Sequence, residues 1–599
     1  MPITDAEVAR RVAGETVARR FATTVHERGG AVALRWKDGD GYRTLTFSEY
    51  ADLATRVAAG FGALGVGRGT RVALLVRNRP EFHVADVAAL LTGATPISIY
   101  NSSSPDQIRY VAGHARAEVV VVESGEFLER LLAVRDDLPA LREVVVIGDG
   151  YEGTNPWSEL VAADPVELDA AASVARPDDL VTVIYTSGTT GEPKGVMLDH
   201  ANICWTIESL RVALGYPSDG FRLVSYLPMA HIAERMVTHY SGIRFGYEVT
   251  TCPDLRELAT YLRETRPELL FGVPRTYEKI NSGLRAFVAA DPGKNAEFDH
   301  ALEIGLEVDM ARARGEEPSA ELSRRFEAVD ATALRPVREL LGLDALRVAV
   351  TAAAPIPVEV LHFFRALGVP LSELYGLSES SGPAAWAPSQ VRVGTVGPPI
   401  PGLELRLGDD GEVIMRGGNV FRGYLDDPER TAEALDPQGW LHTGDIGALD
   451  DDGYLRIVDR KKELIITAGG KNISPANLEA ALKAQPLIGQ ACVIGDDEPY
   501  VVALLVLDPD VAPVWAAQHG VAADALPDLA LDPVVLAEVE REVDEANRNF
   551  SHAEQVRRFR VLGDDWLPDS DELTPTMKLK RRGILTKYAL EIAELYASG

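Results

Sequence analysis

Tyr185-Thr-Ser-Gly-Thr-Thr-Gly-Glu-Pro-Lys-Gly195 is a stretch of glycines and hydroxyl residues with a single lysine, and it directly follows the run Val181-Thr-Val-Ile184. The β-branched run predicts a buried strand. Glycines allow backbone N–H groups to approach an anion closely, because they carry no Cβ, and hydroxyls add further donors. The stretch therefore predicts a strand that enters a phosphate-binding loop, with the following candidate contacts: Thr186, Ser187, Gly188, Thr189, Thr190 and Lys194.

The loop is not a Walker A motif. That motif has Gly-Lys followed by Ser or Thr at the start of a helix, whereas Pro193 precedes Lys194 here and Gly195 follows it. A flexible surface turn would need neither the lysine nor the leading strand. The string resembles the phosphate loop of the adenylate-forming superfamily, which includes acyl-CoA synthetases, luciferases and peptide-synthetase adenylation domains.

Composition restricts the class of protein. The 599 residues exceed what one hydrophobic core usually serves, so two or more domains are expected. The apolar content of 46% and charged content of 25% are those of an ordinary globular protein. A formal charge of −30 argues against a general nucleic-acid binder, which needs a basic surface.

Location is predicted from three features. The three cysteines are far apart and match no disulfide or metal-ligand pattern, which favours a reducing cytoplasm. The N-terminus carries early acids and no apolar core, so we expect no signal peptide. The longest apolar stretch, 87–100, is broken by Gly93 and Pro96, so we expect no membrane span. Peripheral contact with the inner membrane face is the alternative to a purely cytoplasmic location.

Unbroken valine runs alternate with helix-like segments between residues 45 and 150. The runs 71–76, 118–122 and 143–147 predict strands, and 81–91 and 126–134 predict helices. This alternation is typical of parallel strands covered on both faces, so we predict a doubly wound α/β layer. Residues 5–20 are expected to form a helix, and residues 290–345 a helical insertion with Leu302, Leu306 and Met310 on one face.

Further motifs follow the loop in the order that the superfamily has them. In Leu227-Pro-Met-Ala-His-Ile-Ala-Glu-Arg235, His231 alone would be read as a core histidine, but the string resembles the second core motif of the long-chain fatty acyl-CoA synthetase branch. That resemblance implies that the following helix borders the acyl pocket.

Two segments are candidates for the adenine site. Val348-Ala-Val-Thr-Ala-Ala-Ala-Pro355 reads as a strand that ends in small residues, which let backbone close over a flat base; Ala352 and Ala353 stand where the superfamily usually has glycine. Glu373-Leu-Tyr-Gly-Leu-Ser-Glu379 resembles its aromatic-Gly-x-Ser/Thr-Glu motif. The resemblance implies the following contacts: Ala353, Glu373, Tyr375 as a stacking ring, Gly376, Ser378, and Glu379 holding Mg²⁺ with Thr186.

Thr443-Gly-Asp445 resembles the ribose-binding motif, since an ionised aspartate can accept hydrogen bonds from both ribose hydroxyls. Asp410-Gly411 and Asp452-Gly453 predict hairpin turns, so residues 395–458 are expected to form a β-rich subdomain. The segments 459–466 and 469–475 then resemble the hinge and thiol-tunnel motif. The implied residues are Arg460 on ribose or phosphate, Lys462 at the hinge, and Gly469 and Gly470 along the pantetheine path.

Beyond residue 463 the pattern predicts a compact α/β unit with strands at 491–495 and 500–507 and a helix at 533–549. Lys578-Leu-Lys-Arg-Arg582 fits the terminal motif of the superfamily, and its register selects Lys578 over Lys580 as the catalytic lysine. The segment could also be no more than a basic cluster on the surface of an acidic protein. The order of the motifs along the chain favours its interpretation as the terminal motif with the catalytic lysine.

Taken with the resemblance, these features imply an N-terminal domain at 1–461 and a mobile C-terminal domain at 462–599. The expected reaction converts ATP and a long-chain fatty acid into acyl-AMP and pyrophosphate. Coenzyme A then reacts with acyl-AMP to give acyl-CoA and AMP. A ligase that loads a carrier protein and a non-catalytic acyl-nucleotide binder remain alternatives. A carboxylic acid reductase would need more domains after Lys578, and the failed Walker pattern disfavours a P-loop NTPase or kinase.

Overall fold

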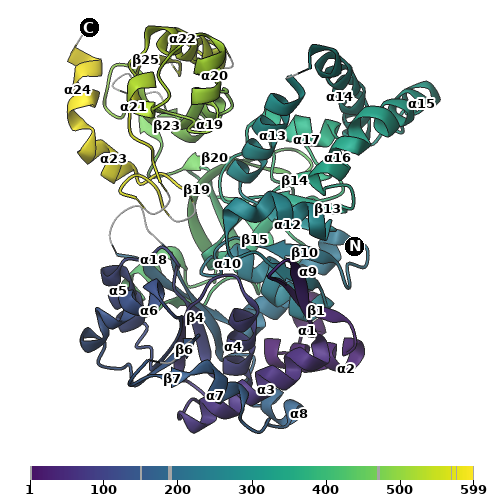
Figure 1. Ribbon diagram of the computed structural model, residues 1–599, viewed down its shortest axis with the longest axis vertical. Helices are drawn as coiled ribbons and strands as arrows, with labels where there is room; N and C mark the ends of the chain where they lie inside the picture. Colours follow the sequence, from purple (N-terminus) through teal and green to yellow (C-terminus); the bar gives the residue numbers. More distant parts are fainter. Residues whose placement is uncertain are drawn as a thin grey trace.

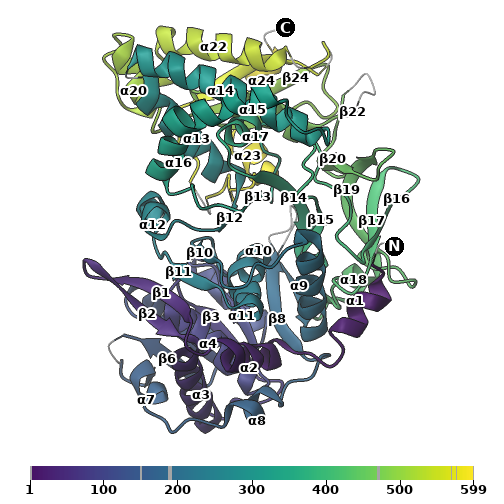
Figure 2. The same ribbon diagram turned by 90° about the vertical axis from the view of Figure 1, so that its right-hand side faces the viewer.

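The computed structural model describes residues 3–148, 151–186, 192–289, 291–467, 472–548, 550–552, 554–567, 570–574 and 577–597. A large body carries most of the chain, a smaller lobe holds the C-terminal residues, and helices α14 and α15 project beside that lobe (Figures 1 and 2). The predicted α/β class is confirmed.

The three predicted strand runs form β3, β5 and β6, the middle of a parallel five-stranded sheet in the order β4-β3-β5-β6-β7. Alternate residues of its strands enter two different cores, Val72 and Leu74 one and Ala73 and Leu75 the other, because side chains along a strand point to opposite faces. The predicted strands and helices are confirmed. Their bounds are β3 Arg71–Leu75, β4 Thr95–Ser98, β5 Val119–Glu123, β6 Glu143–Ile147, β7 Asn155–Pro156, α3 Phe47–Ala63, α4 Pro80–Leu91, α5 Pro105–His114, α6 Glu126–Leu132, α7 Trp157–Val161 and α8 Leu168–Ala172.

Three further sheets complete the middle of the body, in the orders β18-β9-β8, β10-β11-β1-β2 and β12-β13-β14-β15. Their strands are β1 Val32–Asp38, β2 Gly41–Thr46, β8 Leu180–Thr186, β9 Lys194–Asp199, β10 Arg222–Ser225, β11 Glu248–Thr251, β12 Leu269–Gly272, β13 Val348–Thr351, β14 Leu371–Leu377, β15 Gly382–Trp386 and β18 Gly423–Tyr424. The helices beside them are α9 His200–Leu214, α10 Ile232–Glu234, a π-helix at Arg235–Tyr240, α11 Ser241–Phe245, α12 Leu258–Thr265 and α17 Val358–Ala366.

The β-rich subdomain has the antiparallel order β16-β17-β19-β20, with α18 Pro428–Ala434 beside it. Both predicted Asp-Gly hairpins are present. Gly411 and Gly453 have φ of 81°, a left-handed conformation that glycine adopts without steric cost. The strands are β16 Glu404–Leu407, β17 Glu412–Arg416, β19 Leu441–Leu449 and β20 Leu455–Arg460.

The C-terminal lobe is built on a sheet in the order β23-β24-β25 with a separate core on each face. The predicted strands and the long helix are confirmed, with bounds that differ from the prediction by at most three residues. The elements are β21 Ile465–Ile466, β22 Asn472–Ile473, α19 Pro475–Lys483, β23 Ile488–Ile494, β24 Val501–Leu507, α20 Ala512–Gln518, α21 Leu526–Leu529, α22 Pro533–Asn547, β25 Val556–Leu562, α23 Arg581–Lys587 and α24 Ala589–Ala597.

The helical insertion predicted at 290–345 is confirmed as α14 Pro292–Ala313, α15 Ala320–Val329, a π-helix at Asp330–Leu334 and α16 Arg335–Leu341. It is preceded by α13 Pro274–Ala289, which was not predicted from the sequence. Leu302 is buried against α17, but Met310 is 48% exposed near the end of α14. The single helix expected at 5–20 is wrong. The chain forms α1 Asp5–Arg11 and α2 Val17–Arg28, because Gly14 turns at φ 78° and Thr16 caps α2 by accepting from the N–H of Arg19.

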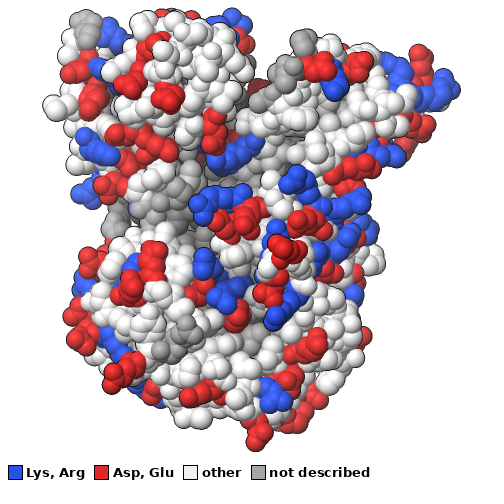
Figure 3. Space-filling view, in the orientation of Figure 1, with Lys and Arg blue, Asp and Glu red and all other residues white. Residues whose placement is uncertain are grey.

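Acidic and basic side chains are interspersed over the face seen in Figure 3, where a notch separates the C-terminal lobe from the projecting helices. The surplus of acids is therefore spread over this face instead of forming one patch. In the part of the chain that the structure describes, no helix has both the length and the apolarity needed to cross a membrane.

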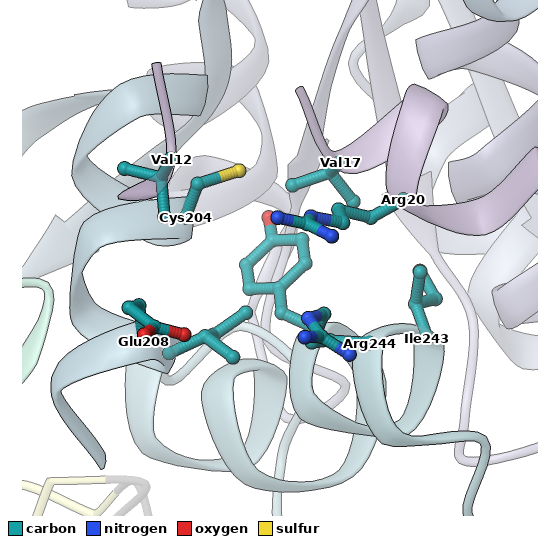
Figure 4. Close-up of a pocket in the computed structure, with 9 residues that line it drawn as sticks. Val12, Val17, Arg20, Cys204, Glu208, Ile243 and Arg244 are labelled. Carbon is teal, nitrogen blue, oxygen red and sulfur yellow. The ribbon is translucent and has the colours of Figure 1, made fainter. Parts of the chain in front are cut away.

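All three cysteines are buried as free thiols, and burial raises the pKa of each to about 12. Cys204 borders a cavity of about 10 Å³, room for about one water, between α2, α9 and α11 (Figure 4). A thiol reagent cannot enter a space of that size.

Because the thiolate is the reactive form, we expect native protein to react with an aromatic disulfide reagent far more slowly than denatured protein does. The denatured protein should release three equivalents of the aromatic thiolate, one for each cysteine. Fast reaction of the native protein would contradict this burial.

Candidate nucleotide site

A cavity of about 1280 Å³ lies between the body and the C-terminal lobe. The body supplies the end of β13, most of the loop after it, the second half of β14, the middle of β19 and most of β20. The lobe supplies α19, the segment that precedes α23 and part of α23 itself. Seven residues selected from the sequence line this one cavity although they are widely separated in the chain. They are Ala353, Glu373, Tyr375, Gly376, Asp445, Arg460 and Lys578.

Tyr375, Asp445 and Arg460 form a connected group on the floor of the cavity. The Tyr375 hydroxyl donates to Asp445 Oδ2 at 2.6 Å, and Arg460 Nε lies 3.0 Å from Asp445 Oδ1. Asp445 and Arg460 are direct partners across the β19–β20 pair, which explains their meeting. Burial and the Asp445 charge raise the pKa of Tyr375, so its hydroxyl stays protonated as a donor. The group can present a fixed carboxylate and guanidinium to a sugar phosphate.

Glu379 is connected to Lys194 through a tyrosine that sequence reasoning missed. The Tyr424 hydroxyl donates to Glu379 Oε1 at 2.7 Å, and Lys194 Nζ lies 4.6 Å from the centre of the Tyr424 ring. Tyr424 reaches this place because β18 pairs with β9, which begins at Lys194. No local sequence pattern predicts that Tyr424 belongs to the site, because Gly423–Tyr424 is a strand of only two residues. The contact becomes apparent only from the pairing of β18 with β9.

Lys578 enters the cavity from the lobe. Its backbone N–H donates to Thr574 Oγ1 at 3.0 Å, while Arg581 holds the same segment by donating to Glu479 at 2.7 Å and to the carbonyl of Val493. The side chain is exposed to the cavity but surrounded by protein. This crowding, together with repulsion from Arg460, lowers the pKa of Lys578, whereas Asp445, Glu463 and Glu379 raise it. Lys578 therefore lines the same cavity as Asp445 and Arg460, two of the residues expected to contact nucleotide.

The loop after β13 carries backbone strain. Ala353 has φ of 78°, a left-handed conformation that costs a residue with Cβ about 1–2 kcal/mol. It is one of the two alanines at which the resemblance to the superfamily leads us to expect glycine, and it lines the cavity as expected. Glu373 also lines the cavity, and burial raises its pKa to about 7.

Gly376 has a packing reason as well as a place in the cavity. A Cβ at this position would lie 1.7 Å from the carbonyl oxygen of Gly382 on β15. Ser378 is buried beyond β14 and does not line the cavity, and the hydroxyl of Ser380 beside it donates to the carbonyl of Gly382. Glycine is therefore required here for the β14–β15 pair to form.

His231 caps α10, where Nδ1 accepts from the N–H of Ala233 at 3.2 Å. Burial, with a smaller repulsion from Lys578, lowers its pKa to about 3, so the ring is neutral. The arginine that ends the motif has a structural role. Arg235 is fully buried and pairs with Asp86, donates to Ser98 Oγ at 2.6 Å, and begins the π-helix.

Glu234 of the same motif is buried, and burial raises its pKa to about 7, although Ser225 and Thr238 donate to it. The folded state therefore keeps a proton that the unfolded state loses above about pH 4.5. Stability contributed by this proton is present at low pH and is lost as pH rises to about 7. We expect Glu234→Gln, which keeps both hydrogen bonds, to flatten this decline by up to about 3 kcal/mol between pH 4.5 and 7 in urea unfolding. An equal decline in both proteins would contradict the assignment.

The remaining predicted residues are placed as follows. Thr186 ends β8 opposite Lys194, and Lys462 lies in the turn after β20. Six predicted residues lie outside the described residues, namely Ser187, Gly188, Thr189, Thr190, Gly469 and Gly470.

Magnesium is the metal that the nucleotide chemistry implies. Within the described ranges, no group of three or more His, Cys, Asp or Glu side chains could hold a metal alone. Glu379 Oε1 is taken by Tyr424, and among the described residues Oε2 has no hydrogen-bond partner. One free carboxylate oxygen fits Mg²⁺, which takes most of its ligands from phosphate and water.

Two family models match the chain. Residues 21–425 match "AMP-binding enzyme", and residues 462–599 match "AMP-binding enzyme C-terminal domain". The chain belongs to the AMP-binding enzymes, the adenylate-forming class that the motifs resemble.

Curated relatives place it further within that family. It is 39% identical over 93% of its length, and 93% of the relative's, to "Long-chain-fatty-acid--CoA ligase FadD15" of Mycobacterium bovis. It is 35% identical to "Long-chain-fatty-acid--CoA ligase ACSBG2" of Xenopus laevis, over 97% of this chain and 84% of that protein. The solved anthranilate CoA ligase AuaEII, in complex with anthranoyl-AMP, superposes with a TM-score of 0.75 at 21% identity, covering 98% of this chain and 99% of that one, and it supports the fold.

Proposed function

We propose that this chain is a long-chain fatty acid–CoA ligase that forms acyl-AMP and then acyl-CoA. The observation that best supports the proposal is that Lys578 of the lobe lines one cavity together with Arg460 and Asp445 of the body. Its relatives over nearly the whole chain bear the names of such ligases. The substrates are ATP, a long-chain fatty acid and coenzyme A, and we place the reaction in the cytoplasm, in keeping with the free thiols.

In the first half-reaction a carboxylate oxygen of the fatty acid attacks the α-phosphorus of ATP, and pyrophosphate leaves. Two anions must meet, so the protein's task is positioning and charge neutralisation. Lys578 contributes its ammonium where the carboxylate and α-phosphate come together. Asp445 accepts hydrogen bonds from the ribose hydroxyls, displacing or sharing its bond with Tyr375. Arg460 and Lys194 balance the charge of the phosphates.

Mg²⁺ would be held by Glu379 and Thr186 and would neutralise phosphate charge when bound. Tyr424 orients the Glu379 carboxylate by donating to one of its oxygens. The nucleotide base would lie against the Ala353 loop and the Tyr375 ring, both of which line the cavity.

In the second half-reaction the thiol of coenzyme A attacks the acyl carbonyl, and AMP leaves. Lys578 fills part of the cavity and would obstruct this attack. We propose that the lobe turns about Lys462, at the boundary of domains 1–461 and 462–599, and brings the segment with Gly469 and Gly470 to the acyl-AMP. Hinge rotation of this kind is an ordinary way of changing a site between steps.

The test is product analysis with ATP, Mg²⁺ and palmitate, with and without coenzyme A. Acyl-CoA that accumulates with AMP and pyrophosphate only when coenzyme A is present supports the proposal. Acyl-AMP that builds up and does not react with coenzyme A would indicate a carrier-loading ligase instead. ADP as product, or no turnover at all, would overturn the proposal.

A further inference from the structure

We propose that Arg275 and Lys279 on α13 are positioning residues that hold the C-terminal lobe where Lys578 reaches the nucleotide. Together with Asp508 and Asp510 they form a group that we call the latch. The latch would favour the first half-reaction over the second. The inference rests on the proposed function, because it concerns the balance of those two steps.

The latch consists of two ion pairs between the body and the lobe. Arg275 Nη2 lies 2.6 Å from Asp508 Oδ2, and Lys279 Nζ lies 3.1 Å from Asp510 Oδ2. Arg275 also faces Glu278 at 3.6 Å on its own helix. Both pairs join residues more than two hundred positions apart in the chain.

The body side of the latch is fixed to the nucleotide site. Tyr277, between the two cations in the sequence, is fully buried and directs its hydroxyl to the carbonyls of Leu270 and Val350 at 3.4 and 3.2 Å. Val350 belongs to β13, whose end leads into the Ala353 loop of the cavity. The cations therefore keep a constant position relative to the base-binding loop.

The lobe side is equally fixed. Asp508 directly follows the central strand β24, and its Oδ1 accepts from the N–H groups of Asp510 and Val511 at 2.9 and 3.1 Å, which leaves Oδ2 for Arg275. Strand β24 pairs with β23, and the β23 carbonyl of Val493 accepts from Arg581 near Lys578. A rigid path thus connects the latch to the lysine.

The two pairs differ in strength. The side chains of Arg275 and Asp508 are only 20% and 9% exposed, so salt screens their attraction weakly. Lys279 and Asp510 are 56% and 70% exposed, and such surface pairs contribute little alone. Asp565 faces the same cluster, and burial together with the Asp508 charge raises its pKa. The lobe thus presents an excess of acid to the cations of α13.

The latch lies away from the hinge. Figure 2 shows α13 and α20 on the side of the molecule opposite β20, which leads to Lys462. A rotation about Lys462 would move Asp508 and Asp510 away from α13 and break both pairs. The latch therefore stabilises the position of the lobe in which Lys578 lines the nucleotide cavity.

The test measures the half-reactions separately. In Arg275→Gln and in Asp508→Asn, which keeps the backbone hydrogen bonds, we expect palmitate-dependent ATP–pyrophosphate exchange to fall by about tenfold, the effect of a loss of about 1.4 kcal/mol. Thioester formation from supplied palmitoyl-AMP and coenzyme A should be unchanged or faster. The matched control is Arg285→Gln on the same helix, because Arg285 pairs with Asp299 of the body and, within the described residues, forms no ion pair with the lobe.

Exchanging the charges of Lys279 and Asp510 tests whether a loss of exchange activity comes from the lost ion pair or from a folding defect. Lys279→Glu in the background of Arg275→Gln should lower exchange further, and adding Asp510→Lys should recover that additional loss. Equal loss of both half-reactions, loss in the Arg285→Gln control, or no loss in any latch variant would overturn the latch. Absence of exchange in the unmodified protein would instead overturn the proposed function.

Discussion

Lys578→Ala is expected to lower the rate of palmitate-dependent ATP–pyrophosphate exchange by about 10³-fold, in the upper range for loss of a single group that stabilises developing charge. Exchange requires the carboxylate and α-phosphate to approach each other, and in the proposed mechanism Lys578, which lines the cavity with Asp445 and Arg460, neutralises their charge. Thioester formation from supplied acyl-AMP should be nearly unchanged, because in the proposed mechanism Lys578 leaves the cavity before that step.

The control is Lys580→Ala, two residues further along the chain. Lys580 Nζ donates to the carbonyl of Ser570 at 2.8 Å within the lobe, so its loss should leave most of the exchange activity. Comparable losses in both half-reactions for Lys578→Ala, or a larger effect at Lys580, would show that the register of the terminal motif had been misassigned.

Gly376→Ala should destabilise the body by more than about 3 kcal/mol, the upper range for overpacking, or prevent folding. The new methyl group would lie 1.7 Å from the Gly382 carbonyl oxygen and 2.6 Å from its carbon, and both are backbone atoms that cannot move aside singly. The β14–β15 pair would have to separate, and with it the support of Tyr375.

Gly62→Ala provides the comparison in chemical unfolding. Gly62 lies in α3, and a Cβ added there would have no atom within 4 Å, so alanine should raise helix stability by up to about 1 kcal/mol. Should Gly376→Ala unfold at the same urea concentration as the unmodified protein, the close approach of β14 and β15 would be refuted.

The sequence predicts much of the fold because the information is local. Unbroken valine runs mark β3, β5 and β6, since strands covered on both faces need apolar residues at every position. Asp-Gly pairs mark the hairpins of the small subdomain. The prediction of one helix across Gly14 is wrong for a local reason as well. The hydrophobic periodicity continues through this segment, but Thr16 caps the start of a second helix.

The site is predictable only where a motif marks it. The motifs locate Tyr375, Asp445, Arg460 and Lys578, which the fold brings into one cavity. Tyr424 carries no motif, and its contact with Glu379 depends on pairing between β18 and β9. The latch is equally invisible, because an arginine and an aspartate far apart in sequence are ordinary surface residues until the lobe is placed.

The size of the cavity has a consequence for inhibition. At about 1280 Å³ it exceeds the roughly 300–1,000 Å³ of common ligand pockets, and residues from both the body and the lobe line it. A stable mimic of acyl-AMP would contact both parts at once and would compete with ATP and with fatty acid. By keeping the lobe closed it would also slow its own release, so that long residence on the enzyme, more than fast capture, would determine its potency.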